Sequence, residues 1–489
     1  MRRGLTSVVL LGALVTGCTS TAEPSAQVTR PAPSTALPTP QSSSTPQSIS
    51  TPQSSPTPQQ PRHQPVVLAV HPSRGTVDLG LGAARAVIAG QVRSWRQIVP
   101  SAARPPGDTL RLTGVAGTGV PAARTASLAA ALRLVRTDAR AVAVVLASAV
   151  GPSVRVIRVA GVDPLREPSR YPLRMAGPAP TGPVLTMTIG GDVMLGRRVA
   201  TAAARAGDPA APLRPLSRRL AAADLTVLNL ESTLSRAGAP RQGGDSFAAP
   251  PSVLPGIRAA GVDVLSLANN HTGDFGDLAL RDTVARVRAA GIAPVGAGSN
   301  HAEAWRPVLV TRAGVRFGFV AFNAIGETPR PTDDSAGAAS VRMPPRTGPL
   351  NAADVALLTR TVAQVRRSAD VVVVLPHWGA QYTHRPDPAQ RTVARAALDA
   401  GADLVVGGHP HWVQGIDAIS NKIVAHSLGN LVFDMDFSRQ TQEGFLLELT
   451  FWGRRLMAAV PVPYRIGPDF TPRLVTGTTA AAVLRPLWP

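Results

Sequence analysis

The sequence predicts an α/β protein with two folded regions behind a long N-terminal tether. Apolar runs of strand length alternate with stretches of helical length from residue 66 onward. A stretch rich in proline and glycine at 176–183 divides this alternation into a smaller region, 65–180, and a larger region that begins at Val184. A length of 489 residues suits two or three domains, and a hydrophobic share of 44% is enough to bury their cores.

Residues 1–18 have the form of an export signal. Two arginines precede an apolar run over residues 5–15, which is too short to span a bilayer. Residues 15–18, VTGC, resemble a bacterial lipobox, so Cys18 is the expected lipidation site. The alternative is a plain signal peptide with an incidental cysteine. The first reading predicts an exported lipoprotein of the cell membrane that faces away from the cytoplasm.

Residues 19–64 consist mostly of serine, threonine, proline and glutamine, with STPQS at both 44–48 and 50–54. This composition cannot form a core and predicts a disordered tether. No later segment offers about 18 uninterrupted apolar residues, so we expect no further membrane span. Because the chain has one cysteine, a disulfide framework and a cysteine-rich zinc or iron–sulfur site are excluded.

The smaller region is predicted to be a small basic α/β domain, with 15 arginines against 5 acidic residues in 65–180. Its expected strands and helix are VVLAV (66–70), AVAVVLASAV (141–150), VRVIRVAGV (154–162) and residues 123–136. Through Ile88, Gly90 and Trp95 the region resembles part of a phosphate-type periplasmic solute-binding protein. It has about half the size of such a protein, so ligand binding and a structural or docking role both stay open.

The larger region is predicted to contain repeated βα units whose apolar runs end in polar or ionisable residues. The expected strands are LTMTIGGDVML, DLTVLNLE, VDVLSLANNH, VRFGFVAFN, ADVVVVLPHW, ADLVVGGH and KIVAHSLGN, and the expected helices cover 276–290, 351–367 and 388–400. A continuous apolar run such as VVVVL (371–375) indicates a strand that is covered on both faces. Ligands of open α/β sheets bind at the carboxyl ends of such strands.

Candidate metal ligands lie at five of these strand ends. They are Asp192, Glu231, Asn269, Asn270, His271, His377, His409 and His411. Any one of them suits a turn, a cap or a buried polar position, and we expect Asp274 to cap the helix after it. Four histidines at the ends of three buried strands favour a metal centre instead. Carboxylate, amide and imidazole ligands suit manganese, iron or zinc, and Glu231 is the candidate to bridge two ions about 3.5–4 Å apart.

Six ordered motifs give the larger region a family resemblance. GGDVMLGR, NLES, LANNHTGDFG, PHWGAQY, GGHPHWVQG and HSLGNLVFD resemble the CapA family of poly-γ-glutamate capsule biosynthesis proteins. That family resembles calcineurin-like metallophosphoesterases. The resemblance implies a four-layer αββα sandwich over 184–440, completed by C-terminal strands in 441–489. It also implies one or two divalent ions as cofactors.

The resemblance implies roles for individual residues. Asp192, Glu231, Asn270, His377, His409 and His411 match the ligand positions, and His271 matches the catalytic histidine. Two features depart from the metallophosphatase pattern, because Met194 stands where a histidine ligand is usual and Glu231 where aspartate is usual. Gln381 also replaces an acid in the family's His-Trp-Gly-x-Glu-Tyr motif.

The expected reaction is metal-assisted hydrolysis or transfer with His271 as general acid. Arg197, Asn269 and Asn430 are the expected substrate contacts. A solvated Arg197 and an Asn430 that only shapes its turn are the alternatives. His426 is expected either behind the ligands or facing the site.

The formal charge of +20 predicts an acidic partner. The resemblance implies poly-γ-glutamate or a related anionic polymer, with a capsule-synthesis complex at the membrane as a further partner. A non-catalytic factor for polymer binding or assembly is the alternative to a hydrolase. Nucleic acid is not expected, because the chain is predicted to be exported and has no aromatic–basic recognition motif.

Overall fold

The computed structural model describes residues 63–99, 108–177, 180, 182–419 and 421–488. The predicted signal with Cys18 and the tether up to residue 62 lie outside these residues, so both stay predictions. Within the described ranges, no helix is long and apolar enough to cross a membrane. The first strand, β1 (His63–Val70), begins inside the last two residues assigned to the tether.

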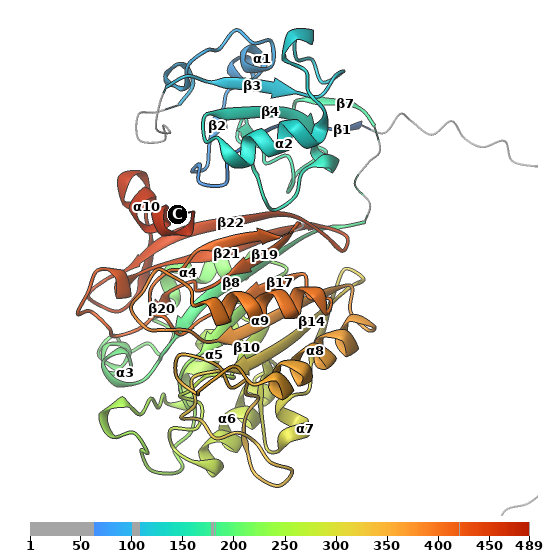
Figure 1. Ribbon diagram of the computed structural model, residues 1–489. Coiled ribbons are helices and arrows are strands. Elements are labelled where there is room, and N and C mark those ends of the chain that lie inside the picture. Colours follow the sequence, from blue (N-terminus) through green and yellow to red (C-terminus); the bar gives the residue numbers. More distant parts are fainter. Residues whose placement is uncertain (1–62, 100–107, 178–179, 181, 420, 489) are drawn as a thin grey trace, which may run out of the picture. The chain divides into compact units, whose positions relative to one another are not determined.

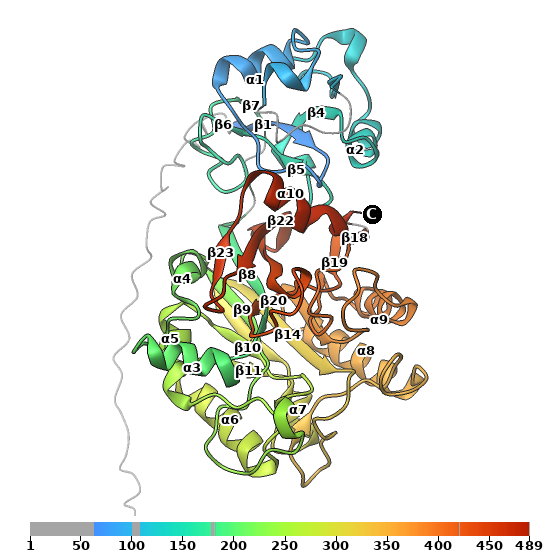
Figure 2. The ribbon, with the colours of Figure 1, turned by 90° about the vertical axis from the view of Figure 1, so that its left-hand side faces the viewer.

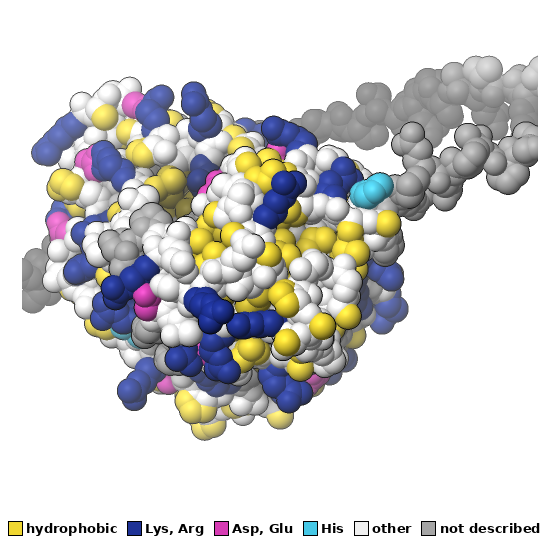
Figure 3. All heavy atoms as spheres, turned by 90° about the horizontal axis from the view of Figure 1, so that it is seen from above, with side chains coloured by type: hydrophobic (Ala, Val, Ile, Leu, Met, Phe, Trp, Pro, Cys, Tyr) yellow, Lys and Arg dark blue, Asp and Glu magenta, His cyan; other side chains and the backbone are white. Residues whose placement is uncertain are grey.

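The smaller region contains a five-stranded sheet in the order β3-β4-β1-β5, with β7 paired to β1. Its other strands are β3 (Arg111–Gly114), β4 (Ala141–Leu146), β5 (Arg155–Val156) and β7 (Arg174–Ala176), while β2 (Asp78–Leu79) and β6 (Arg158–Val159) form a separate pair. Arginine side chains are spread over the face seen in Figure 3, where acidic side chains are few. The basic character expected from the sequence is visible on this surface.

Two helices, α1 (Leu81–Ile88) and α2 (Leu128–Thr137), belong to this region. The predicted helix over 123–136 is wrong at its start, because residues 122–124 form a separate 3-10 turn. The Ser127 side chain accepts a hydrogen bond from the backbone N–H of Ala130 at 3.3 Å, which caps α2. The cap decides where the helix begins.

The β1 strand is buried on both faces. Leu68 belongs to one apolar core, and Val67 and Ala69 belong to another. The second core includes Trp452 of the larger region, whose indole N–H donates to the carbonyl of Leu165 at 2.8 Å. The smaller region therefore packs an apolar sheet face against the larger one.

The larger region is built on two mixed sheets. The first has the order β11-β10-β9-β8-β21-β22-β23, with β20 beside β8, and comprises β8 (Val184–Val193), β9 (Leu225–Leu230), β10 (Val264–Ser266), β11 (Ala293–Val295), β20 (Asn430–Val432), β21 (Glu443–Trp452), β22 (Arg455–Ile466) and β23 (Pro472–Leu474). The second has the order β13-β14-β16-β17-β19-β18 and comprises β13 (Val308–Arg312), β14 (Val315–Asn323), β16 (Val371–His377), β17 (Leu404–Val406), β18 (Ile416–Ile419) and β19 (Lys422–Ala425).

Helices cover the outer faces of both sheets, which gives four layers (Figures 1 and 2). The first sheet carries α3 (Arg197–Arg205), α4 (Arg214–Ala221), α5 (Leu254–Ala259) and α6 (Asp277–Ala289), and the second carries α8 (Ala352–Arg366) and α9 (Pro388–Asp399). Two further helices are α7 (His301–Ala304) and α10 (Gly477–Leu484). The expected αββα sandwich and the three helices predicted for this region are confirmed.

Side-chain alternation along β16 explains the layers. Val371, Val373 and Leu375 point into the core between the two sheets, whereas Val372 and Val374 pack under α8 and α9. The expectation that this apolar run is covered on both faces is confirmed. Because β8, β9 and β10 run parallel, as do β14, β16 and β17, each set places its carboxyl ends at one edge.

Candidate metal centre

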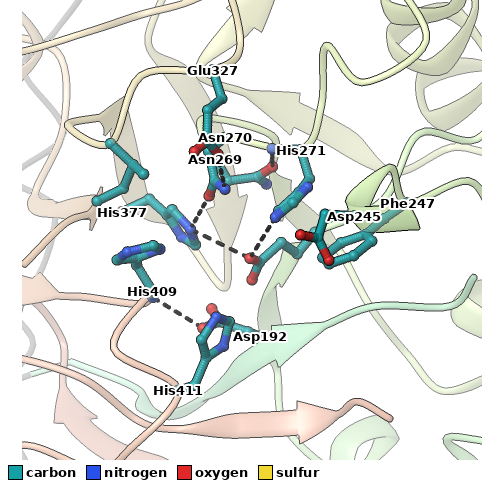
Figure 4. A network of polar contacts seen from close by, with 12 residues as sticks. Asp192, Asp245, Phe247, Asn269, Asn270, His271, Glu327, His377, His409 and His411 are labelled. Carbon is teal, nitrogen blue, oxygen red and sulfur yellow. Dashed lines mark hydrogen bonds and ion pairs between the residues drawn. The ribbon is translucent and has the colours of Figure 1, made fainter. Parts of the chain in front are cut away.

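The candidate metal centre lies where the carboxyl ends of the two sheets meet (Figure 4). The first sheet contributes Asp192 from the end of β8 and Glu231 from the residue after β9. The second contributes His377, the last residue of β16, together with His409 and His411 from the loop after β17. All five side chains are buried. The structure thus brings together most of the ligands expected from the strand ends.

Glycines allow the backbone segments of the centre to approach one another closely. A Cβ atom on Gly191 would lie 1.9 Å from the carbonyl oxygen of Gly429, and one on Gly408 would lie 2.3 Å from Oδ1 of Asp192. Any side chain at either position would collide with backbone or with a candidate ligand. Steric crowding therefore explains why the GGD, GGH and SLGN motifs contain glycine.

Backbone strain is concentrated at the centre. Nine non-glycine residues among those described have a positive φ, and five of them, Arg197, Glu327, Tyr382, His409 and His411, lie in or beside the centre. Such a conformation is unfavourable for residues with a Cβ atom and persists where the surrounding structure enforces it. This clustering favours a functional role for the centre independently of the residue types.

The five buried side chains form two groups that share one carboxylate. One group is Glu231, His377 and His409, and the other is Asp192, Glu231 and His411. Within each group one ligand atom per residue lies within 4.8 Å of the others. Glu231 therefore has the position expected of a residue that bridges two ions.

The unsatisfied polar atoms of the centre fit a bound cation. Both carboxylate oxygens of Glu231 and both ring nitrogens of His409 are buried without a hydrogen-bond partner among the described residues. Leaving such atoms unpaired is costly, and a divalent ion would satisfy them. The donor set of carboxylate oxygens and imidazole nitrogens suits a divalent ion.

Polar neighbours orient the candidate ligands. The amide of Asn229 donates to Asp192 Oδ1 at 2.8 Å and lies 3.3 Å from Nδ1 of His377. The backbone N–H of His409 donates to Asp192 Oδ2 at 3.0 Å. These contacts fix the Asp192 carboxylate and leave Nε2 of His377 directed towards Glu231, 3.6 Å away.

Asn430 contacts a candidate ligand. Its Oδ1 lies 2.9 Å from Nδ1 of His411, and its amide donates to the carbonyl of Thr441 at 3.0 Å. Asn430 is fully buried, and its amide is taken up by these two contacts. Its place in the structure is that of a residue that orients His411, whereas the predicted substrate contact stays untested.

Burial raises the pKa values of the two carboxyl ligands, a shift that a bound cation would reverse, and lowers the pKa values of the three histidine ligands, a shift that favours cation binding. Burial raises the pKa of Asp192 to about 6 and that of Glu231 to about 8, so both carboxyls are hard to ionise alone. Burial also lowers the pKa of His377 to about 4 and that of His411 to about 3, and it lowers the pKa of His409 well below the ordinary value. Neutral imidazole is the form that binds metal.

His271 faces the centre from the first sheet and is held by Asp274. Its Nδ1 lies 2.8 Å from Asp274 Oδ2, its Nε2 lies 3.9 Å from Glu231 Oε1, and Phe247 stacks on its ring at 3.7 Å. Burial alone would lower the pKa of His271. The hydrogen bond to Asp274 and the charge of Glu231 outweigh burial, and its pKa lies above the ordinary value.

The expected cap at Asp274 is wrong. The N-cap of α6 is Gly276, without a side-chain hydrogen bond. Instead the Asp274 carboxylate accepts from the backbone N–H of Phe247 at 2.7 Å and from the side chain of Gln242 at 2.5 Å, in addition to its contact with His271. Only the folded chain brings these distant partners to Asp274.

Asn269 and Asn270 differ in position. Asn269 is buried, donates to the carbonyl of Leu230 at 2.8 Å and accepts from the backbone N–H of His271 at 3.1 Å, so it shapes the loop. Asn270 presents Oδ1 2.9 Å from Nε2 of His377 and donates to Glu327 at 2.7 Å. Asn270 lies beside His377, and both its predicted role as a metal ligand and the predicted substrate contact of Asn269 stay predictions.

Glu327 is a site residue that the sequence reasoning missed. It lies four residues after the end of β14, a strand for which the sequence predicted no site residue. It accepts from Asn270 and pairs with Arg346 at 2.7 Å. The rule applied to the other strand ends would have found it.

Arg197 borders the centre but is already paired. Its guanidinium forms an ion pair with buried Asp434, lies 3.6 Å from Asp245 and stacks over Phe247 at 4.4 Å. The side chain is about one quarter exposed, at 28%. A substrate anion would therefore share Arg197 with Asp434.

His426 lies apart from the candidate ligands. It is buried, and its Nε2 lies 2.8 Å from Asp417 on β18. Among the described residues, the His426 side chain makes no hydrogen bond to any of the five ligands. The structure therefore supports neither the position behind the ligands nor the position facing the site.

The two departures from the metallophosphatase pattern leave both ligand groups intact. Met194 is buried in the core beneath the first sheet, and His411 joins Asp192 and Glu231 in its group. Gln381 is only partly buried and lies three residues after Trp378, whose indole donates to the carbonyl of His426 at 3.0 Å. The absence of a histidine at position 194 thus still leaves a group of three ligands that includes Asp192.

The family model described as bacterial capsule synthesis protein PGA_cap matches residues 186–435, about half of the chain. The matched span contains every candidate ligand. The chain belongs to this capsule synthesis family. The family resemblance expected from the six motifs is confirmed.

Individual relatives of the PGA_cap family agree with this membership. Capsule biosynthesis protein CapA of Bacillus anthracis is 34% identical over 301 residues, which cover 60% of this chain and 70% of that protein. PGA biosynthesis protein CapA of Bacillus subtilis is 32% identical over 186 residues, which cover 38% of this chain and 46% of that protein.

Two solved structures are similar at a lower level. A putative 5'-nucleotidase from Staphylococcus aureus has a TM-score of 0.38 and 15% identity, and the match covers 62% of this chain and 58% of that one. An ABC-type phosphate transport receptor from Vibrio cholerae has a TM-score of 0.20 and 17% identity over 23% of this chain and 54% of that one. The sandwich described above rests on its own strand order, and for residues 65–180 ligand binding and a structural or docking role both stay open.

Removing metal should make stability depend on pH between about 6.5 and 8. Folded Glu231 keeps its proton up to about pH 8, whereas an unfolded glutamate has lost it above about pH 5. The folded state then binds more protons, as it also does at His271, so the unfolding free energy falls as pH rises, by about 1–2 kcal/mol over this range. Below about pH 6.5 the three neutral histidine ligands have the opposite effect, because the unfolded chain binds their protons.

Urea unfolding of the chelator-treated protein across this pH range measures the decline. Saturating Mn²⁺ should remove it, because a bound cation favours ionised carboxylates. The variant Glu231→Gln should lose most of the decline without metal. An equal decline in that variant would show that another group is responsible.

Proposed function

We propose that this chain is a metal-dependent hydrolase that acts in the synthesis or processing of poly-γ-glutamate, or a related anionic polymer, at the cell envelope. One observation carries the proposal: two buried groups of three ligands share Glu231, beside a histidine held by Asp274. The capsule family membership supports the polymer, and the predicted signal with Cys18 supports export and a lipid anchor. The proposed cofactor is one or two manganese, iron or zinc ions.

The ligand geometry supports hydrolysis near neutral pH. Asp192, Glu231, His377, His409 and His411 would hold the ions, with Asn270 beside His377. A divalent ion supplies Lewis-acid chemistry and a strong nucleophile from water near pH 7. The burial of all five side chains excludes bulk water from the ligands and strengthens every charge interaction among them.

His271 is the proposed general acid. Because Nδ1 donates its hydrogen to Asp274, Nε2 is the nitrogen that faces Glu231 and the centre. The hydrogen bond to Asp274 and the charge of Glu231 raise the pKa of this imidazole above its ordinary value, which favours its protonated form. His271 can therefore give a proton from Nε2 to a leaving oxygen or nitrogen.

A turnover assay on the purified chain tests the proposal. After chelation and reloading with Mn²⁺, Fe²⁺ or Zn²⁺, the protein is incubated with an aryl phosphodiester and, separately, with poly-γ-glutamate whose length is followed by gel filtration. We expect metal-dependent turnover that chelation abolishes. Absence of turnover on both substrates with every metal, together with full metal occupancy, would overturn the hydrolase and favour the assembly factor.

A further inference from the structure

A groove of about 620 Å³ opens at the amino ends of the second sheet. Five arginines line it, namely Arg316, Arg366, Arg367, Arg454 and Arg455. Two aspartates of its lining, Asp370 and Asp403, directly precede β16 and β17. Because His377 is the last of the seven residues of β16, the groove and the metal centre lie about 20 Å apart, at opposite ends of that strand.

The groove carries positive charge that its own aspartates do not neutralise. Arg316 pairs with Asp370 at 3.3 Å, and Arg366 pairs with Asp403 at 2.7 Å. The other three arginines have no carboxylate within ion-pair distance among the described residues. The lining therefore holds an excess of three positive charges.

Arg455 is fixed in place although its charge is uncompensated. Its guanidinium donates to the carbonyls of Ser148 at 2.5 Å and Val150 at 2.9 Å. Neutral carbonyls hold the side chain without cancelling its charge, so it remains available to an anion. Arg454 next to it and Arg367 on the C-cap of α8 are exposed.

We propose that this groove is a second binding site, which takes an acidic polymer through its carboxylates. The polymer's identity as poly-γ-glutamate rests on the proposed function. Guanidinium groups suit carboxylates because their planar donors match two oxygens. A single exposed ion pair contributes little, so useful affinity requires several carboxylates on one ligand, which a polymer provides and a free amino acid does not.

A polymer bound there would be held while another segment of it reaches the metal centre. Binding at one site raises the effective concentration of neighbouring segments at the other. The groove thus supplies retention, and the centre supplies chemistry. The two roles can be measured separately.

Equilibrium binding of fluorescein-labelled poly-γ-glutamate to the full-length chain in chelator tests the groove without a contribution from metal. The double variant Arg367→Gln/Arg454→Gln should bind about tenfold more weakly, which corresponds to the loss of two exposed ion pairs. The matched control Arg258→Gln/Arg395→Gln removes two exposed arginines from α5 and α9 and should bind as the wild type does.

Equal weakening by the control pair would mean that net charge alone binds the polymer, and unchanged binding of the groove variant would mean that the groove is not the site. Either result overturns the proposal. So does a groove variant that loses binding only to vesicles of anionic phospholipid, because the ligand is then a membrane. Since no turnover is read, failure of the hydrolase would leave this binding result standing.

Discussion

Replacing Glu231 by glutamine is expected to abolish metal binding at both ligand groups and all metal-dependent turnover. Glu231 belongs to both groups, and neither of its oxygens has another partner among the described residues. Loss of an outer partner of a ligand already costs about 10–100-fold in metal affinity, so loss of a shared ligand should cost more than about 100-fold. Metal analysis after dialysis and calorimetric titration with Mn²⁺ measure the effect.

The folded state of Glu231→Gln should persist without metal. The substitution removes a buried carboxyl whose pKa burial raises to about 8, so the metal-free variant should be at least as stable as the metal-free wild type above that pH. The matched control is Glu448→Gln, a buried glutamate on β21 that pairs with Arg166 and Arg219. This control should lose stability but keep its metal. Full metal occupancy in Glu231→Gln would refute the bridging role.

Replacing His271 by glutamine is expected to lower turnover by about 10²–10⁴-fold while the metal content stays unchanged. His271 is outside both ligand groups, but its Nε2 faces Glu231 across 3.9 Å. The substitution removes the proton donor and keeps a polar side chain under Phe247. Steady-state rates with the best metal and substrate, alongside metal analysis, separate the two effects.

A second variant distinguishes catalysis from structure. Asp274→Asn removes the charge that holds the pKa of His271 above its ordinary value, so the alkaline limb of the pH–rate profile should move to lower pH. His301→Gln on α7 serves as the control and should keep the wild-type rate. An unchanged rate in His271→Gln would rule out His271 as general acid.

Much of the architecture can be predicted from the sequence because its signals are local. The run VVVVL predicts a strand that is covered on both faces, and β16 is such a strand. The helix expected over 351–367 is α8, and the side chain of Asn351 caps its start. The start of α2 was missed because a single serine, Ser127, decides it.

The candidate ligands could also be predicted, because parallel strands bring their carboxyl ends to one edge. Their partners could not. Asp274 lies three residues from His271, but its other contacts come from Gln242 and Phe247. Its position before a helix is typical of a cap and gives no indication of these contacts. Similarly, Asn430 contacts His411, and Arg197 pairs with Asp434. In both cases the partner is distant in the sequence.

By itself the sequence determined the α/β class, the order of the strands along the chain, the ligand types and the family. Residue periodicity and the residue types at strand ends are properties of short segments, so they can be recognised in the sequence without knowledge of the fold. Only the tertiary structure decided which ligands join Glu231, the bridging residue expected from the sequence, in each of two groups. It also decided that three arginines with no carboxylate partner among the described residues gather at the far end of the same strands. Both depend on sheet order and register, which long-range packing sets and no short segment encodes.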